Sequence, residues 1–148
     1  ILLNMAIIDV DYFKRYNDTY GHQDGDACLV KIAGMLNSYF RRSNETVARY
    51  GGEEFIVMNM GDAVKEFTER LSELSGLIEK GKIEHAGSMI GDFVTISTGV
   101  ASTADTECNS VDELIRASDS ALYMAKGEGR NRVVVFSESH LKRVNASS

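Results

Sequence analysis

The chain of 148 residues is 43% hydrophobic and 26% charged, which is enough for one domain with its own core. The formal net charge of -6 and the lack of a basic stripe exclude a nucleic-acid surface, whereas an anionic mononucleotide needs only a few local cations and a metal. Cys28 and Cys108 offer neither a disulfide framework nor a metal-binding spacing, so we expect a reducing, cytoplasmic setting.

The first predicted element is a strand in the apolar run from Ile1 to Ile8, which only Asn4 interrupts. Such a run is typical of a strand buried on both faces, and it is too short and wrongly flanked for a membrane span or a signal peptide. We therefore expect no membrane contact by this domain. The run ends in Asp9-Val10-Asp11, and packing does not explain carboxylates at that point. Asp11 is either the N-cap of the next helix or, like Asp9, part of a functional site.

Two helices are predicted after this strand. A short one covers about Tyr12 to Tyr20, and Gly21 leads into a longer one. The apolar side chains of the longer helix recur on one face, which we assign to the core. They are Leu29, Ile32, Ala33, Leu36 and Phe40.

A hairpin is predicted next, because Gly51-Gly52 separates apolar arms at Val47 to Tyr50 and Phe55 to Met60. Glu53 and Glu54 then lie at the mouth of the second arm. Glycine leaves room for a large ligand beside the backbone, and carboxylates are the hard oxygen ligands that Mg²⁺ prefers. Taken alone, the motif is equally consistent with a solvated acidic rim.

The end of the first strand and the hairpin would form one metal site if they are neighbours. Asp9 and Glu53 would then converge with the Val10 carbonyl on one or two divalent ions. Lys14 would add a positive charge nearby. This is equipment for phosphoryl or nucleotidyl transfer, in which the protein mostly supplies position and charge.

The second half of the chain predicts two more helices and two more strands. Gly61-Asp62 starts a helix, and Phe93 to Ala101 alternates as a strand with one face covered. Ser110 and Glu113 form a capping box for the last helix, and Val133 to Phe136 is the last strand. The stripe of the third helix consists of Val64, Phe67, Leu71, Leu74 and Ile78. The stripe of the last helix consists of Leu114, Ser118, Ala121, Leu122 and Ala125.

This order of elements predicts an α/β fold, with a mixed central sheet flanked by helices. We assign residues 1–137 to one domain and residues 138–148 to a frayed or disordered tail. Ligands of open α/β sheets usually bind at the rim, where the hairpin turn and the end of the first strand would meet.

Three motifs span most of the chain. They are Asp9-x-Asp11-x-Phe13-Lys14-x-x-Asn17-Asp18-x-Tyr20-Gly21-His22-x-x-Gly25-Asp26, Arg49-Tyr50-Gly51-Gly52-Glu53-Glu54-Phe55 and Ala121-Leu122-Tyr123-x-Ala125-Lys126-x-x-Gly129-Arg130-Asn131. In this order and spacing they resemble the GGDEF domain of diguanylate cyclases, in a GGEEF variant. The resemblance implies a palm-like sheet similar to that of class III nucleotidyl cyclases and some polymerases. Family members usually have a helix and an Asp-x-Leu-Thr-Gly-Leu-type segment before the first strand, so we expect this chain to end a longer protein.

The resemblance implies that two GTP are condensed into cyclic di-GMP and two pyrophosphates, with Mg²⁺ or Mn²⁺ as cofactor. Because each 3′-hydroxyl attacks the other GTP, the resemblance also implies a two-fold homodimer that is held together by the full-length protein. That protein can be a membrane-anchored or sensor protein of which this domain is the cytoplasmic part. The isolated fragment is then expected to be a poor enzyme. The alternative is a non-catalytic sensor of GTP or cyclic di-GMP. Asn17 and Asp26 together disfavour an ATP-using cyclase.

The resemblance also assigns roles at the expected metal site. Asp9, the Val10 carbonyl and Glu53 match metal ligands. Glu53 further matches the residue suspected of taking the proton from the attacking hydroxyl, although a metal-activated hydroxide or water is an alternative base. Glu54 either coordinates a second ion or holds the turn. Lys14 matches a cation that contacts the triphosphate.

Asn17 and Asp26 match the guanine-reading pair of the family. A carboxylate accepts from guanine N1–H and N2–H₂, and an amide donates to O6, whereas adenine lacks those two donors. His22 either lies near the nucleotide or only closes the helix junction. Gly51 and Gly52 are expected to border the nucleotide.

Lys126 and Arg130 match phosphate-binding cations, although the helix dipole also favours cations at a helix C-terminus. Gly127 and Gly129 favour the functional interpretation, because they end the helix and let the backbone turn toward a ligand. One departure concerns an inhibitory product site with the pattern Arg-x-x-Asp, for which this chain has Arg42 and Glu45. The longer glutamate loosens that geometry, so we expect a degenerate site and weak product inhibition.

Overall fold

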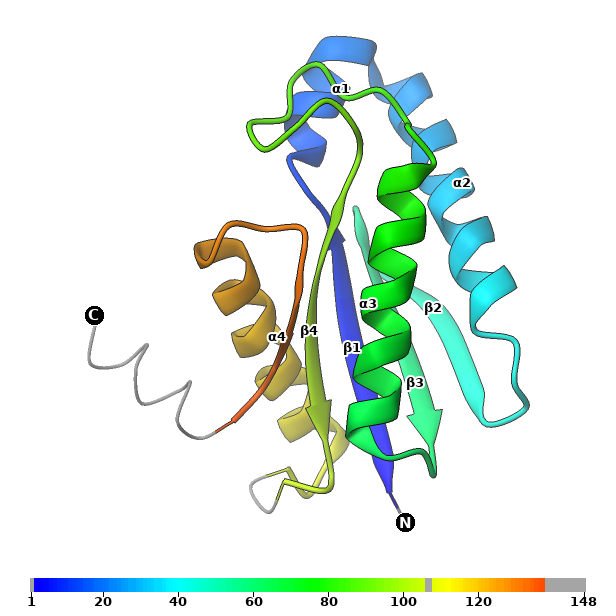
Figure 1. The fold of residues 1–148 in the computed structure, drawn as a ribbon, viewed down its shortest axis with the longest axis vertical. Helices are drawn as coiled ribbons and strands as arrows, with labels where there is room; N and C mark the ends of the chain where they lie inside the picture. Colours follow the sequence, from blue (N-terminus) through cyan, green and yellow to red (C-terminus); the bar gives the residue numbers. More distant parts are fainter. Residues whose placement is uncertain (1, 106–107, 138–148) are drawn as a thin grey trace.

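The computed structural model describes residues 2–105 and 108–137, so the predicted tail at 138–148 lies outside the described residues. The elements follow one another as a strand, two helices, a hairpin, a helix, a strand, a helix and a strand (Figure 1). In chain order they are β1 (Leu3–Val10), α1 (Phe13–Tyr20), α2 (His22–Tyr39), β2 (Glu45–Gly51), β3 (Glu54–Met60), α3 (Val64–Lys80), β4 (Ile96–Ser102), α4 (Val111–Gly127) and β5 (Val133–Val135).

The strands form one mixed sheet in the order β2-β3-β1-β4-β5. The central strand β1 pairs antiparallel with β3 and β4, and β5 pairs parallel with β4. The predicted α/β class with a mixed sheet is confirmed. The prediction that β1 lies beside the second arm of the hairpin is confirmed as well, because Ile8 pairs with Phe55 and Asp9 with Glu54.

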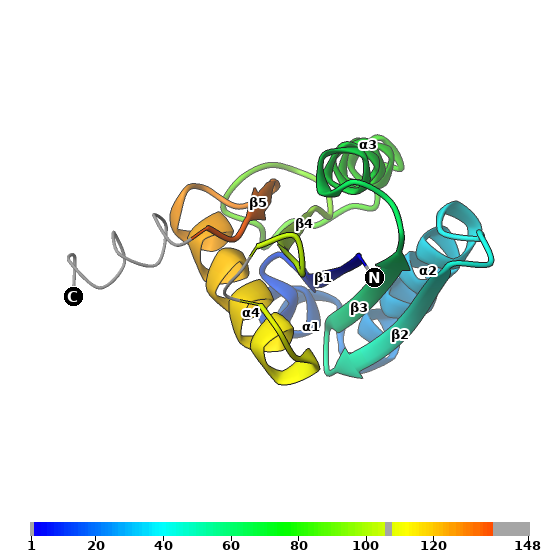
Figure 2. The same ribbon diagram turned by 90° about the horizontal axis from the view of Figure 1, so that it is seen from below.

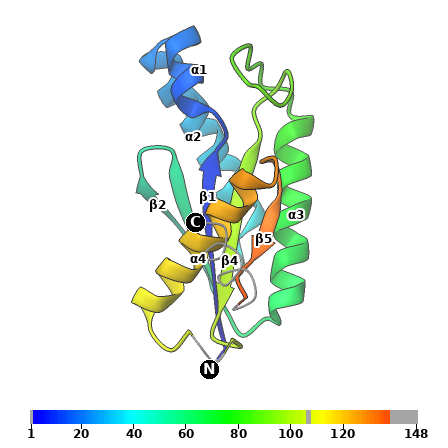
Figure 3. The same ribbon diagram turned by 90° about the vertical axis from the view of Figure 1, so that its left-hand side faces the viewer.

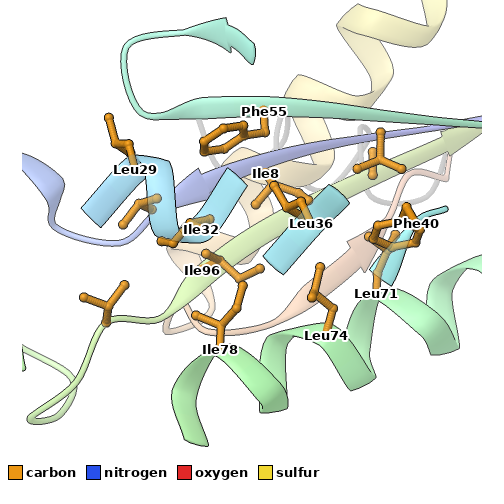
Figure 4. Packing of buried hydrophobic residues seen from close by; sticks show 14 of the residues in the cluster. Ile8, Leu29, Ile32, Leu36, Phe40, Phe55, Leu71, Leu74, Ile78 and Ile96 are labelled. Carbon is orange, nitrogen blue, oxygen red and sulfur yellow. The ribbon is translucent and has the colours of Figure 1, made fainter. Parts of the chain in front are cut away.

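Helices cover both faces of the sheet (Figures 2 and 3). One face packs against α2 and α3, and its core joins the predicted stripes of those helices to inward residues of β1, β3 and β4, among them Ile8, Phe55 and Ile96 (Figure 4). The other face packs against α4, where Met5 and Ala101 meet Leu114 and Ala117. The continuous apolar run of β1 is explained by this burial on two sides.

The prediction that β4 has only one covered face is wrong. Every residue of β4 is buried, because α3 lies on one side of the strand and α4 on the other. The polar and small residues of its second face permit very close packing of α4. A Cβ at Gly99 would lie 2.1 Å from the Ser118 carbonyl oxygen, so only glycine fits there.

The helix starts agree with the sequence in one case and differ in another. Ser110 caps α4 by accepting from the Glu113 N–H at 3.2 Å, as predicted, while the Glu113 carboxylate accepts from the N–H of Asn109 at 3.3 Å. The third helix does not begin at Gly61-Asp62, because Ala63 is its N-cap. Asp62 stays outside the helix, because its N–H donates to Asn59 Oδ1 and its carboxylate accepts from Asn59 Nδ2, which fixes it to the end of β3.

Candidate active site at the rim of the sheet

The end of β1 and the turn between β2 and β3 meet at one rim of the sheet. Asp9 is the pairing partner of Glu54, and the Val10 N–H donates to the Glu53 carbonyl at 3.3 Å. Asp9 is 4% exposed, whereas the turn itself is open. The sheet therefore brings the two predicted acidic groups together.

The glycines of the turn leave open space. Neither Gly51 nor Gly52 has a positive φ, and a Cβ at either position would meet no atom within 4 Å. Arg49 secures the turn from outside, because its guanidinium donates to the Gly52 carbonyl at 3.0 and 2.6 Å. Neither a positive φ nor internal packing therefore requires glycine at these two exposed positions.

The negative charge of the carboxylates at this rim is only partly compensated by Lys126. Burial raises the pKa of Asp9; the Lys126 ammonium, 2.6 Å from Asp9 Oδ2, opposes the rise, while Glu53 and Asp11 add to it. Burial likewise raises the pKa of Glu54, and the charge of Asp9 contributes. A cation placed here would relieve this repulsion.

Among residues 2–105 and 108–137, no three His, Cys, Asp or Glu side chains converge closely enough to hold a metal ion by themselves. The predicted ligand set has a different composition, with two carboxylates, Asp9 and Glu53, and one backbone carbonyl, that of Val10. Such a set leaves the remaining positions around an ion to water or to substrate oxygens, which is common for Mg²⁺.

The junction of α1 and α2 places the predicted base-reading residues. Gly21, with φ of 90°, joins the helices, and Gly25 of α2 lies against Asn17 of α1, where a Cβ would come within 1.8 Å of Asn17 Oδ1. That oxygen is buried and has no hydrogen-bond partner in the described structure. Asp26 and His22 are exposed on the first turns of α2. The junction therefore packs the Asn17 side chain against the backbone of α2, one residue before Asp26.

The predicted cations approach from two elements. Lys14 is exposed on α1, and Lys126 lies at the last turn of α4. Arg130 follows α4 with φ of 66°, after Gly129 with φ of 124°, and its guanidinium carbon lies 4.4 Å from the centre of the Tyr12 ring. Within the described residues neither Lys14 nor Arg130 makes an ion pair, so both charges face solvent or a ligand.

The assignment of Asp11 to the N-cap of α1 is wrong. The N-cap of α1 is Tyr12, which makes no side-chain cap bond, and the Asp11 carboxylate points into the protein. It accepts from Thr95 Oγ1 at 2.7 Å, from Ser97 Oγ at 2.5 Å and from the Asn131 N–H at 3.1 Å. Two buried hydroxyl residues spaced by two, Thr95 just before β4 and Ser97 within it, were the available signal for these partners.

The residues assigned to an inhibitory site lie at the other end of the sheet, and Glu45 is turned inward. Its side chain has no exposed surface, and it pairs with both terminal nitrogens of Arg70 and accepts from Asn59 at 3.1 Å. Burial opposes its charge, but these hydrogen bonds and one from the Arg42 N–H hold the pKa of Glu45 below its usual value. The Arg42 guanidinium instead pairs with Asp62 and Glu66.

Comparison with known proteins places this geometry in a family. Residues 2–132 match the family model described as diguanylate cyclase, GGDEF domain. Diguanylate cyclase A of Treponema denticola is 39% identical over 133 residues, which cover 90% of this chain and 35% of the relative. The chain spans about a third of the length of the curated relatives it matches.

Two solved structures share the fold at similar identity. The GGDEF domain of DgcB from Caulobacter crescentus in complex with c-di-GMP has a TM-score of 0.80 and 30% identity, covering 90% of this chain and 77% of that one. The active GGEEF domain of a diguanylate cyclase from Vibrio cholerae has a TM-score of 0.78 and 29% identity, covering 93% and 84%. In the part of the chain that the structure describes, no helix is both long and apolar enough for a membrane span.

Proposed function

The chain belongs to the GGDEF domain family of diguanylate cyclases, and from this premise we propose that it condenses two GTP into cyclic di-GMP and two pyrophosphates, using the GGEEF form of the signature. One observation carries the proposal. Asp9 and the two glutamates after Gly52 meet at an open rim, where the glycines impose no steric limit and Lys126 is the ion partner of Asp9. A metal-bound triphosphate needs this combination of carboxylates, access and cations.

The donor set fits Mg²⁺ or Mn²⁺, which we propose is held by Asp9, Glu53 and the Val10 carbonyl. Such an ion polarises phosphate oxygens and lowers the pKa of the attacking hydroxyl. Lys126, which neutralises Asp9 in this structure, then becomes available for the phosphates, together with Lys14 and Arg130. Glu53 orients the attacking 3′-hydroxyl and accepts its proton directly or through water. Glu54, the first residue of β3, either coordinates a second ion or holds the turn.

We assign base selection to Asn17 and Asp26. Asp26 accepts from guanine N1–H and N2–H₂, and Asn17 completes the contact through its amide. The contact of Asn17 with Gly25 supports this assignment, because it places the Asn17 side chain at the junction of α1 and α2, next to the residue that precedes Asp26. His22 lies at the same junction, as the exposed first residue of α2.

One domain binds one GTP in this proposal, and catalysis requires a second copy that faces the first across a two-fold axis. We propose that the rest of the full-length protein controls this pairing. The deciding experiment fuses the chain to a forced dimeriser, adds GTP and Mg²⁺, and separates the products by chromatography. Formation of cyclic di-GMP supports the proposal, and GTP binding without any product would favour the non-catalytic sensor.

A binding experiment tests the base assignment separately. Asp26→Ala is expected to weaken GTP binding by about 1–3 kcal/mol, because the base edge loses a charge-assisted partner, and to leave weak ATP binding unchanged. Titration calorimetry of GTP and ATP with the parent and the variant measures both. Equal GTP affinity in the two proteins would contradict the assignment.

A further inference from the structure

Two left-handed backbone segments lie next to each other beside the proposed phosphate site. Tyr12, directly after β1, has φ of 54°, and Arg130 and Asn131, after α4, have φ of 66° and 47°. Asparagine adopts this conformation readily, whereas tyrosine and arginine seldom do, so Tyr12 and Arg130 are held there by their surroundings. The two segments touch, because the Arg130 guanidinium lies over the Tyr12 ring.

The Asp11 carboxylate joins these segments. It is the neighbour of Tyr12 in sequence, and its Oδ2 accepts from the N–H of Asn131, the neighbour of Arg130. Thr95 and Ser97 of the β4 side donate to the same carboxylate, so all three of its hydrogen bonds come from elements other than β1. Asp11 is 1% exposed, and no water is needed to satisfy it.

A buried histidine holds the backbone of the same bend. His85 Nε2 lies 3.2 Å from the Asp11 carbonyl oxygen and 3.1 Å from that of Tyr12, to which it donates. The His85 ring also packs edge-on against Tyr16 of α1. His85 therefore fixes the position of Tyr12 through the backbone. The carboxylate bond to Asn131 helps to hold the turn at Arg130, together with the bonds from the Arg130 N–H to the Ala125 carbonyl at 2.9 Å and from Arg132 Nε to the Arg130 carbonyl at 3.0 Å.

We propose that Asp11 is a positioning residue for the phosphate-binding cation Arg130. Its bond to the Asn131 N–H holds the turn after α4 in the left-handed form that brings the guanidinium over Tyr12, with its N–H edge free for the triphosphate. This inference rests on the proposed function. It differs from a role in folding alone, because it predicts a loss specific to the triphosphate.

The test measures the affinity of the chain for GTP and for GMP, each with Mg²⁺, by titration calorimetry. Asp11→Ala and Arg130→Ala are each expected to weaken GTP binding about tenfold and GMP binding less than about twofold, because only GTP carries the phosphates that a charged donor would contact. The double variant is expected to lose no more than either single variant, because both changes remove the same interaction.

Thr95→Val is the matched control. It removes a hydroxyl that donates to the same carboxylate and leaves the Asn131 bond in place. It is expected to lower the melting temperature and to leave GTP affinity unchanged. Equal losses for GTP and GMP, additive losses in the double variant, or a tenfold loss of GTP affinity in Thr95→Val would overturn the inference.

Asp11→Asn keeps the test decisive if Asp11→Ala does not fold. Its amide oxygen still accepts from Asn131, and the Ser97 hydroxyl can turn to accept from the new amide N–H, so GTP binding should stay within about threefold of the parent. Hydrogen exchange of the Asn131 amide reports whether the bond persists. If the inference is right, GTP affinity is retained when the Asn131 amide stays protected from exchange and is lost when that protection is lost. An Asp11→Asn protein in which only one of these two quantities changes overturns the inference. Parent protein that binds no GTP would instead overturn the proposed function.

Discussion

The two ends of the sheet each hold a buried carboxylate paired with a cation, and their surroundings differ. At one end Glu45 has both oxygens occupied by Arg70, Asn59 and the Arg42 backbone. At the other end Asp9 has one ion partner, Lys126, and the acidic Glu53 and Glu54 lie nearby. We call the Glu45 end saturated, because both carboxylate oxygens have donors, and the Asp9 end unsaturated. A saturated pair stabilises the fold, whereas an unsaturated carboxylate beside open space can still bind a ligand.

The largest effect is expected from Glu53→Gln at the unsaturated end. Loss of this charge should abolish cyclic di-GMP formation by a forced dimer, a drop of about a thousandfold or more, because a metal ligand and a base candidate are removed together. Chromatography of the products measures the loss, and thermal melting controls for folding. Normal turnover by a folded Glu53→Gln protein would end the assignment of this rim as the active site.

At the saturated end the expected effect is on stability. Arg70→Ala leaves the Glu45 charge buried and unpaired, which should cost roughly 3–5 kcal/mol of unfolding free energy in urea titrations. Arg42→Ala is the matched control: its pairs with Asp62 and Glu66 are half exposed, so its cost should stay below about 1 kcal/mol. Similar costs for both variants would remove the distinction between the two ends.

A pair of glycines on α2 sharpens the comparison at the rim. An added methyl at Gly25 would collide with Asn17 Oδ1, so Gly25→Ala should displace the Asn17 amide and weaken GTP binding about tenfold. Gly34→Ala, where a Cβ meets nothing within 4 Å, should leave binding unchanged and add about 0.5–1 kcal/mol of stability through helix propensity. Calorimetry and urea unfolding separate the two results. Full GTP affinity in Gly25→Ala would argue against Asn17 as a base contact.

The saturated end should also be sensitive to acid. The folded-state pKa of Glu45 is lowered, so the stability that it contributes is present above its unfolded pKa and is lost as pH falls through the folded value. Glu45→Gln should be less stable than the parent by about 1–2 kcal/mol at neutral pH, and the gap should narrow below about pH 4. Urea unfolding at several pH values measures the gap. A gap that does not change with pH would show that the pairing charge contributes little.

The smallest effect is expected for product inhibition. Because Glu45 is committed to Arg70, micromolar cyclic di-GMP should barely slow an active dimer, and Arg42→Ala should not change this. Initial rates with added product provide the measurement. Strong inhibition that disappears in Arg42→Ala would show a working inhibitory site.

The sequence was sufficient for the parts of the molecule that depend on local patterns. The hairpin, the stripes of α2 and α3 and the Ser110 cap followed from periodicity and turn residues. The pairing of β1 with β3 was only assumed, as the condition for a shared metal site. The partners of Asp11 and Glu45 did not follow from local patterns, because each meets residues 25 or more positions away in the chain. The second covered face of β4 was missed for a related reason. Its small and hydroxyl residues allow a helix to pack closely, but they form no hydrophobic pattern from which that packing can be predicted.

The contact between Gly99 and Ser118 separates the rigid part of the rim from its adjustable part. Since α4 rests directly on the backbone of β4, the helix and the sheet must move as one body, and Lys126 is carried along with Asp9. The open turn at Gly51 and Gly52 is exposed, and it is held by the Arg49 guanidinium rather than by a helix packed on its backbone. Differences between nucleotide-free and nucleotide-bound forms should therefore be concentrated in the hairpin tip and the junction of α1 and α2, while the spacing of α4 from the strands stays constant.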